Sequence, residues 1–198
     1  LVSLPEADRA RAALERCPLV IVSDVMRHTD TAERADVLLP AAAWAEKTGT
    51  VTNSERMISR QRPFLPRPGQ ARADWDIMCD VAQRMGFAEG FVYAGPAAIF
   101  REHAALTAFD NDGERILNLA GLATLSDTDY DTLQPTRWPV PLPQPRRAAG
   151  AMPAPAGVDQ LFVDGTYPTA DGRAHLVAVS PRGPANACSG DYPLALNT

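Results

Sequence analysis

Two short apolar runs near the start of the chain predict neighbouring strands of a parallel sheet. Residues 19–22 (LVIV) and 37–39 (VLL) are continuously apolar rather than alternating, which is typical of strands covered on both faces. Residues 5–16 predict a helix before the first run, and residues 31–34 predict one helical turn between the two runs. A strand, a helical turn and a second strand in this order favour an α/β fold.

Apolar residues at three- and four-residue steps predict two further helices. The first runs from Asp74 to Met85 and ends at Gly86, and the second runs from Pro96 to Leu106. We expect the first helix to carry one apolar stripe and the second helix to carry one mixed face. The stripe consists of Trp75, Met78, Val81, Ala82 and Met85, and the face consists of Ile99, Phe100 and His103.

A polar run lies between the second strand and these helices. Residues 46–56 carry hydroxyl, amide and charged side chains, so we expect a loop dense in hydrogen-bonding groups. Within it, residues 50–56 can fold into a self-bonded turn, with Glu55 and Arg56 in ion pairs. The prolines of residues 63–69 predict an extended, irregular path to the next helix.

Proline and alanine dominate residues 133–157, which predict a linker of polyproline character. Beyond it, residues 161–163 and 174–179 predict strands, with a hairpin turn at Asp171–Gly172. We therefore divide the chain into the C-terminal part of an α/β domain (1–132), a Pro-rich connector (133–157) and a β-hairpin region with the first strand of a further domain (158–198). This organisation predicts an internal piece of a longer protein.

The composition of the chain argues against several classes of function and partner. A net charge of −5 and a pI near 5.2 argue against nucleic acid or an anionic membrane as a partner, and no apolar run is long enough to span a bilayer. Cys17, Cys79 and Cys188 lie far apart, and the three histidines are scattered, so we assign no metal ligands. The chain has no Gly-x-Gly-x-x-Gly or Walker A motif, and it offers no nucleophile–base pair that would make a catalytic residue.

A few polar residues stand where a ligand would bind in an α/β sheet. Ser23 and Asp24 follow the first strand, and the carboxyl ends of parallel strands are where such sheets bind ligands. Both could instead cap a turn. Lys47 could contact a phosphate or a guanine carbonyl, or be a solvated lysine paired with Glu46 or Glu55. Asp74 could be a helix N-cap, an acceptor for the N1 and N2 donors of guanine, or both.

Three motifs together resemble the molybdopterin oxidoreductases, which bind bis(molybdopterin guanine dinucleotide). They are TAERADVLLPAAAWAEKTGTVTNSER (31–56), PGQARADW (68–75) and YPLALNT (192–198). The resemblance implies a Rossmann-like parallel-sheet portion, a Pro-rich connector and the start of a β-rich dinucleotide-binding domain. It also implies dinucleotide contacts at Ser23, Asp24, Lys47, Asp74 and Thr198. Molybdenum and a [4Fe-4S] cluster belong to the whole protein in this family, with ligands outside this chain.

The second half of the chain narrows the resemblance to assimilatory nitrate reductases. The motifs are IFREHAALT (99–107), GLATLSDTDYDTLQPTRWPVP (121–141) and LFVDGTYPTADGRA (161–174), while Thr48 and Met57 depart from the usual pattern. The resemblance implies a cytoplasmic enzyme that reduces nitrate to nitrite. Its partners are the remainder of the same polypeptide and an electron-donor protein or domain.

Three alternatives remain open at this stage. Periplasmic nitrate reductases and formate dehydrogenases share the first two motifs. A non-catalytic electron-transfer subunit could keep the fold without molybdenum, although loss of Ser23, Lys47 and Asp74 would then be expected, and all three are present. A free-standing small α/β binding domain would need a closed sheet.

Overall fold

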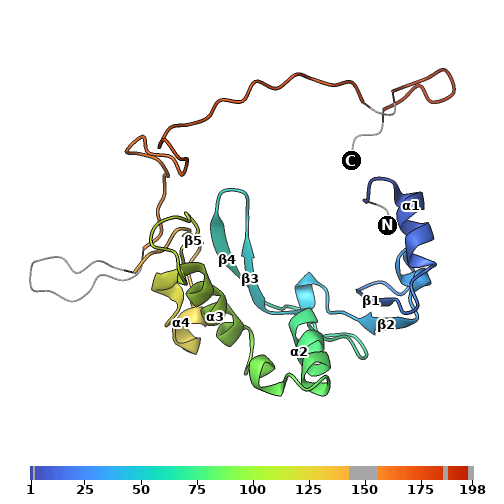
Figure 1. The fold of residues 1–198 in the computed structure, drawn as a ribbon. Coiled ribbons are helices and arrows are strands. Elements are labelled where there is room, and N and C mark those ends of the chain that lie inside the picture. Colours follow the sequence, from blue (N-terminus) through green and yellow to red (C-terminus); the bar gives the residue numbers. More distant parts are fainter. Residues whose placement is uncertain (2, 143–155, 185–186, 196–198) are drawn as a thin grey trace, which may run out of the picture. The chain divides into compact units, whose positions relative to one another are not determined.

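The computed structural model describes residues 1, 3–142, 156–184 and 187–195, and the chain separates into a unit of residues 1–161 and a unit of residues 162–198. All helices and strands among the described residues belong to the first unit (Figure 1). The α-helices are α1 (Ala7–Leu14), α2 (Asp74–Arg84), α3 (Pro96–Ala108) and α4 (Asp127–Asp131). The strands are β1 (Ile21–Asp24), β2 (Val37–Pro40), β3 (Gly49–Thr52), β4 (Met57–Gln61) and β5 (Thr136–Arg137), and the 3-10 turns are η1 (Ala32–Arg34), η2 (Trp44–Glu46), η3 (Ala88–Phe91) and η4 (Ala120–Leu122).

The predicted parallel pair is present, and it makes the first unit a mixed α/β structure. β1 pairs with β2 from Ile21 opposite Val37 to Asp24 opposite Pro40, and the connection contains only the 3-10 turn η1. The prediction of strands covered on both faces is wrong for the described chain, because Leu19 and Ile21 are more than half exposed while Val20 is buried. Within the described residues, other segments cover only one face of this sheet, so buried and exposed residues alternate along the first apolar run.

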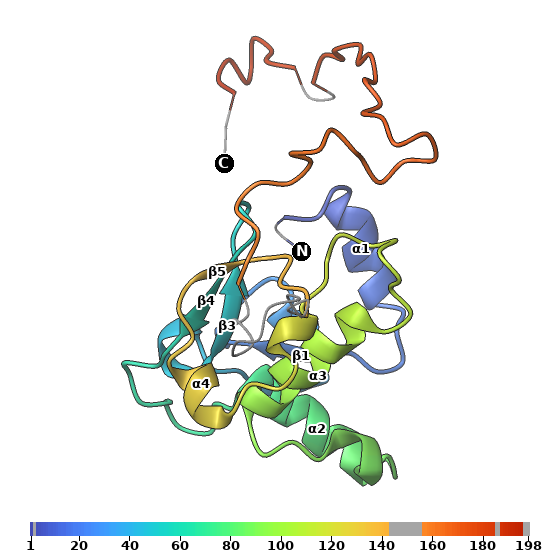
Figure 2. The ribbon, with the colours of Figure 1, turned by 90° about the vertical axis from the view of Figure 1, so that its left-hand side faces the viewer.

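The polar loop predicted at residues 46–56 is wrong in part, because residues 49–52 form strand β3 of a β-hairpin. β3 and β4 are antiparallel, and β5 adds a third strand beside β4 (Figure 2). Thr50 and Thr52 are β-branched, which favours a strand over a loop despite their hydroxyl groups. The predicted self-bonded turn does form: Asn53 Oδ1 accepts from the backbone N–H groups of Glu55 and Met57, each at 3.0 Å. Glu55 pairs with Arg137 at 4.0 Å, but the ion pair predicted for Arg56 is wrong for the described chain, where Arg56 donates to the carbonyls of Val158 and Asp159 instead.

The main apolar core lies between the hairpin and the later helices. It consists of Ile58, Phe100, Ala104, Leu119, Leu122, Tyr130 and Val140. Val140 falls inside the predicted 133–157 connector, yet it is completely buried, and its backbone N–H donates to the Asn118 carbonyl at 2.7 Å. Residues 133–140 are therefore packed into the first unit, because β5 and Val140 supply pairing and apolar contacts that proline content alone does not reveal. Residues 143–155 of the connector lie outside the described residues.

The helices begin and end close to the predicted positions, but their buried faces differ. α2 stops at Arg84, and Gly86 follows with a φ of 95°, which favours glycine. Its apolar stripe is not its buried face: Met78 and Met85 are 64% and 68% exposed, while Ile77 is buried. α1 is shorter at both ends than predicted. In α3, Phe100 and Ala104 are buried, and His103 is exposed.

The second unit contains the predicted turn without the predicted strands. Gly172 accepts from the Tyr167 N–H at 3.0 Å and donates to the Thr169 carbonyl at 3.1 Å, with a φ of 70°. No strand is present in the described part of residues 158–198. Leu176 is 96% exposed. The expected strands at 161–163 and 174–179 are therefore wrong for this chain, since strands need a paired neighbour to satisfy their backbone groups.

Candidate functional site

The site forms where the two parallel strands end. Asp24 is opposite Pro40 at the last register position, and the next N–H, that of Ala41, donates to the Asp24 carbonyl at 3.0 Å. The irregular segment before α2 returns to this edge. Arg72 donates its N–H to the Pro40 carbonyl at 3.0 Å and accepts from the Ala42 N–H at 2.7 Å. This backbone pairing brings the first residue of α2 to the carboxyl ends of β1 and β2.

Three of the five predicted contact residues meet at this edge. Lys47 Nζ donates to Asp74 Oδ2 at 2.9 Å, and Ser23 Oγ donates to Asp74 Oδ1 at 3.3 Å. The Lys47 and Asp74 side chains are 27% and 55% exposed, so a ligand can reach both. The pKa of Asp74 lies below its usual range, chiefly because of the hydrogen bond from Lys47 and with a smaller contribution from Ser23. The cluster therefore presents an ionised carboxylate beside an ammonium group and a hydroxyl.

Lys47 is the only lysine among the 19 basic Lys and Arg residues of the chain. An ammonium is a compact charge on a flexible stem, whereas a guanidinium is a broad planar fork. A chain that uses arginine at every other basic position and keeps lysine here is consistent with a site that requires the smaller group. Its pairing partner is also not one of those considered from the sequence, because Asp74 takes the place of Glu46 and Glu55.

Asp74 does not cap its helix. Ala73 is the N-cap of α2, Asp74 is the first helical residue, and no side chain caps this end. The N-cap prediction is therefore wrong. Both Asp74 oxygens are instead directed to Ser23 and Lys47. The lowered pKa and the accessible position of this carboxylate come from long-range contacts.

α2 is anchored beside the site by the guanidinium of Arg72. Its Nε donates to Asp76 Oδ2 at 2.8 Å, and its Nη1 donates to Asp80 Oδ2 at 2.9 Å. These hydrogen bonds raise the pKa of Arg72 and lower the pKa values of both carboxyl groups. Because the Arg72 backbone pairs with the end of β2, this one residue ties α2 to the sheet.

Asp24 closes the loop after β1. Its Oδ1 accepts from the Met26 N–H at 3.0 Å, and its Oδ2 accepts from Thr29 Oγ1 at 3.1 Å. The pKa of Asp24 is lowered, first by the Met26 hydrogen bond. This geometry is that of the turn cap considered from the sequence, and it leaves Asp24 outside the contacts of the Ser23–Lys47–Asp74 cluster. Thr198, the fifth predicted contact, lies outside the described residues.

Sequence reasoning overlooked Arg60 beside the site. Arg60 Nη2 donates to Thr48 Oγ1 at 3.0 Å, and Nη1 donates to the Gly49 carbonyl, so the two residues after Lys47 are held by one buried side chain. The signal was available: once residues 57–61 are taken as a strand, Arg60 lies on the same face as the buried Ile58.

Two absences concern only the part of the chain that the structure describes. No group of three or more His, Cys, Asp or Glu side chains is arranged to hold a metal ion there. None of the helices described is both long enough and apolar enough to cross a membrane.

Comparison with known proteins shows which proteins this chain is similar to. Residues 1–84 match the pattern that defines the molybdopterin oxidoreductases. A nitrate reductase from Klebsiella oxytoca is 45% identical over 198 residues, which is 100% of this chain and 21% of that protein. Residues 1–84 therefore form part of a molybdopterin oxidoreductase domain, and the whole chain is similar to nitrate reductases. An assimilatory nitrate reductase from Haloferax mediterranei is 37% identical over 201 residues, which is 100% of this chain and 26% of that protein.

A formate dehydrogenase subunit matches less of the chain. An F420-dependent formate dehydrogenase subunit from Methanococcus maripaludis is 41% identical over 107 residues, which is 54% of this chain and 16% of that protein. Among solved structures, an acetylene hydratase from Pelobacter acetylenicus overlaps 63% of this chain and 15% of that chain, with a TM-score of 0.44 and 20% identity. The chain spans about a fifth to a quarter of the length of the nitrate reductases that it matches.

Proposed function

We propose that this chain is part of a longer molybdenum nitrate reductase and that it holds a guanine dinucleotide end of bis(molybdopterin guanine dinucleotide). The observation that supports this most is the Ser23–Lys47–Asp74 cluster, an accessible ion pair at the ends of two parallel strands, in a chain matched over its whole length by nitrate reductases. Open α/β sheets bind ligands at this edge.

The donor and acceptor groups of the cluster fit a guanine nucleotide. A carboxylate such as Asp74 can accept from both N1 and N2 of guanine, and the Lys47 ammonium can donate to the guanine carbonyl or to a phosphate oxygen. The Ser23 hydroxyl can donate or accept. Asp24 and Thr198 complete the predicted contacts, with Asp24 placed at the same strand end. The presence of Ser23, Lys47 and Asp74 favours a cofactor-binding chain over a non-catalytic relative.

When bound, the cofactor would supply molybdenum for the two-electron reduction of nitrate to nitrite and water. This chain would contribute binding and orientation of the nucleotide. In this proposal, residues 1–132 are part of a Rossmann-like domain, and residues 158–198 lead into a β-rich dinucleotide-binding domain. The [4Fe-4S] ligands and the electron-donor site lie elsewhere in the longer polypeptide, and the enzyme works in the cytoplasm.

Nitrate is favoured over formate by how far the similarity extends. The nitrate reductases match the whole chain, including the packed residues 119–140 around the main core, whereas the formate dehydrogenase subunit matches about half of it.

Purification of the longer polypeptide tests the proposal. We expect guanine nucleotide and molybdenum in stoichiometric amounts after acid denaturation, and reduction of nitrate with a reduced viologen dye as electron donor. A purified protein without guanine nucleotide would refute the cofactor assignment. Formate oxidation without nitrate reduction would move the protein to the other branch of the family.

A further inference from the structure

Arg60 is a buried cation with incomplete compensation. Its side chain is 3% exposed, and its only ion pair within the described part of the chain is with Asp131, at 3.1 Å, whose side chain is 71% exposed. The guanidinium lies over the Tyr130 ring at 4.1 Å from the centroid. Among the described residues, the buried Nε has no hydrogen-bond partner. Taking a charge out of water is costly unless it is well paired, so packing alone does not explain why an arginine is buried at this position.

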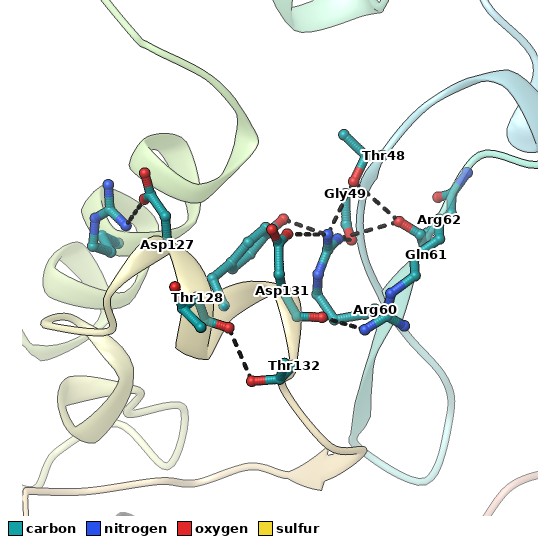
Figure 3. A network of polar contacts seen from close by, with 11 residues as sticks. Thr48, Gly49, Arg60, Gln61, Arg62, Asp127, Thr128, Asp131 and Thr132 are labelled. Carbon is teal, nitrogen blue, oxygen red and sulfur yellow. Dashed lines mark hydrogen bonds and ion pairs between the residues drawn. The ribbon is translucent and has the colours of Figure 1, made fainter. Parts of the chain in front are cut away.

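The hydrogen bonds of Arg60 converge on the segment directly after Lys47. Nη2 donates to Thr48 Oγ1 at 3.0 Å, and Nη1 donates to the Gly49 carbonyl and to the Gln61 carbonyl, the latter at 3.2 Å. Thr48 Oγ1 donates to the Gln61 carbonyl at 3.3 Å. Figure 3 shows the Arg60 side chain between Thr48 and Gly49 on one side and Asp131 on the other. One guanidinium thus joins the start of β3, the end of β4 and the end of α4.

The segment before Lys47 is also held. Arg67 Nε donates to the Glu46 carbonyl at 3.2 Å, and Glu46 Oε2 accepts from the Ala43 N–H at 2.8 Å. The backbone of Lys47 is therefore fixed on both sides. Ordering the ammonium group of a lysine costs side-chain conformational entropy. A fixed backbone lowers this cost, because Nζ then samples fewer positions before a ligand binds. This arrangement suits a lysine that has to meet a ligand together with Asp74.

We propose that Arg60 is a positioning residue for Lys47. It holds Thr48 and Gly49 so that the Lys47 ammonium stands beside Asp74, where both face the same ligand. The chemical class of that ligand, a guanine nucleotide, rests on the proposed function. Through Asp131 and Tyr130, the same side chain makes the position of Lys47 depend on α4, which lies outside the part matched by the family pattern.

If the role of Arg60 is purely structural, its replacement should give a different experimental result. If Arg60 only joins the hairpin to α4, its loss lowers the melting temperature without changing how Lys47 behaves. If Arg60 positions Lys47, its loss has an effect that disappears when Lys47 is already absent. A double-mutant cycle separates the two roles because it measures coupling between the two residues rather than total damage.

The experiment uses the longer polypeptide in its apo form and GDP as the probe, with binding measured by calorimetry. We expect Arg60→Met to weaken GDP binding about tenfold, Thr48→Val to weaken it less, and Arg60→Lys to recover part of the loss. In a Lys47→Met background, Arg60→Met should change binding less than twofold. The matched control is Arg62→Met on the same strand, because Arg62 donates to the Asp131 carbonyl and should leave GDP binding unchanged.

A second measurement follows Lys47 without any ligand. Acylation of its amine, read by peptide mass spectrometry, should become several times faster in Arg60→Met and stay unchanged in Arg62→Met. Equal weakening of GDP binding with and without Lys47, or unchanged acylation in Arg60→Met and Thr48→Val, would overturn the positioning role. A wild-type apo-protein that binds no GDP would instead contradict the proposed function, and the acylation rates would then decide the role of Arg60 alone.

Discussion

Replacing Asp74 by Asn distinguishes the contribution of this carboxylate to the stability of the fold from its contribution to ligand binding. In the structure it caps nothing, and it accepts from Lys47 at 2.9 Å and from Ser23 at 3.3 Å. With side chains 27% and 55% exposed, the Lys47–Asp74 pair is solvated, and such pairs contribute about 0.2–1 kcal/mol. Hydrogen exchange at the start of α2 should therefore accelerate by no more than about fivefold in Asp74→Asn.

The same substitution should affect nucleotide binding far more. It replaces one carboxylate oxygen by an amide donor that would face the N1 and N2 donors of guanine. A mismatch of this kind costs about 1–3 kcal/mol, which corresponds to roughly tenfold to hundredfold weaker binding. We expect the purified longer polypeptide carrying Asp74→Asn to lose most of its guanine nucleotide, measured after acid release, while its apo form melts within a few degrees of the wild type.

Acid titration adds an independent check with a definite sign. The pKa of folded Asp74 is lowered by Lys47, so the stability it contributes is fully present above the ordinary aspartate pKa of about 3.9. That contribution is lost as the pH falls through the lowered pKa. The difference in α2 exchange between wild type and Asp74→Asn should therefore be present at neutral pH and should vanish in strong acid.

Asp76→Asn is the matched control, because it removes the same charge from the same helical turn. Asp76 pairs with Arg72 and has no contact with the Lys47 cluster among the described residues. It should leave the nucleotide content unchanged, because Arg72 keeps its hydrogen bond to Asp80 and its backbone pairing with the end of β2. Full nucleotide content in Asp74→Asn, or an equal loss in Asp76→Asn, would refute the reasoning that Asp74 is a guanine acceptor.

Three further predictions concern the fold and the isolated chain. Val140→Ala should cost about 1.5–3 kcal/mol because Val140 is completely buried, so exchange in residues 119–140 should rise roughly tenfold to hundredfold, whereas the exposed Leu142→Ala should have little effect. Gly86→Ala should speed exchange at the end of α2 about fivefold or more because of the 95° φ, and Gly90→Ala, which meets nothing within 4 Å, should not. The isolated 198-residue chain should hold no molybdenum by elemental analysis; stoichiometric metal would contradict the assignment of all metal ligands to other parts of the longer polypeptide.

Local chemistry alone was enough to predict several elements of the fold. Pro96 and Gly86 predicted the start of α3 and the end of α2 within about two residues, because a fixed φ and a left-handed φ are properties of single residues. The parallel pairing of β1 and β2 followed from two apolar runs with a turn between them. The Asn53 turn followed from side-chain bonds to the backbone two and four residues on.

Tertiary structure decided which surfaces meet, and there the sequence pattern was insufficient. Helical periodicity showed that α2 has an apolar stripe, but Met78 and Met85 are exposed because burial depends on a covering surface that the described chain does not provide. Proline content suggested a linker through Val140, but its burial depends on Leu119 and Ile58, which lie far away along the chain.

The same distinction holds at the site. The resemblance to a family selected Ser23, Lys47 and Asp74 one by one, yet only folding brings Lys47 and Asp74 to 2.9 Å across 27 positions of sequence. Two contacts bring these side chains together: the backbone pairing of Arg72 with the end of β2, and the hydrogen bond from Arg60 to Thr48. Such contacts depend on the free energy of ordering distant segments together, which no local pattern of residues encodes.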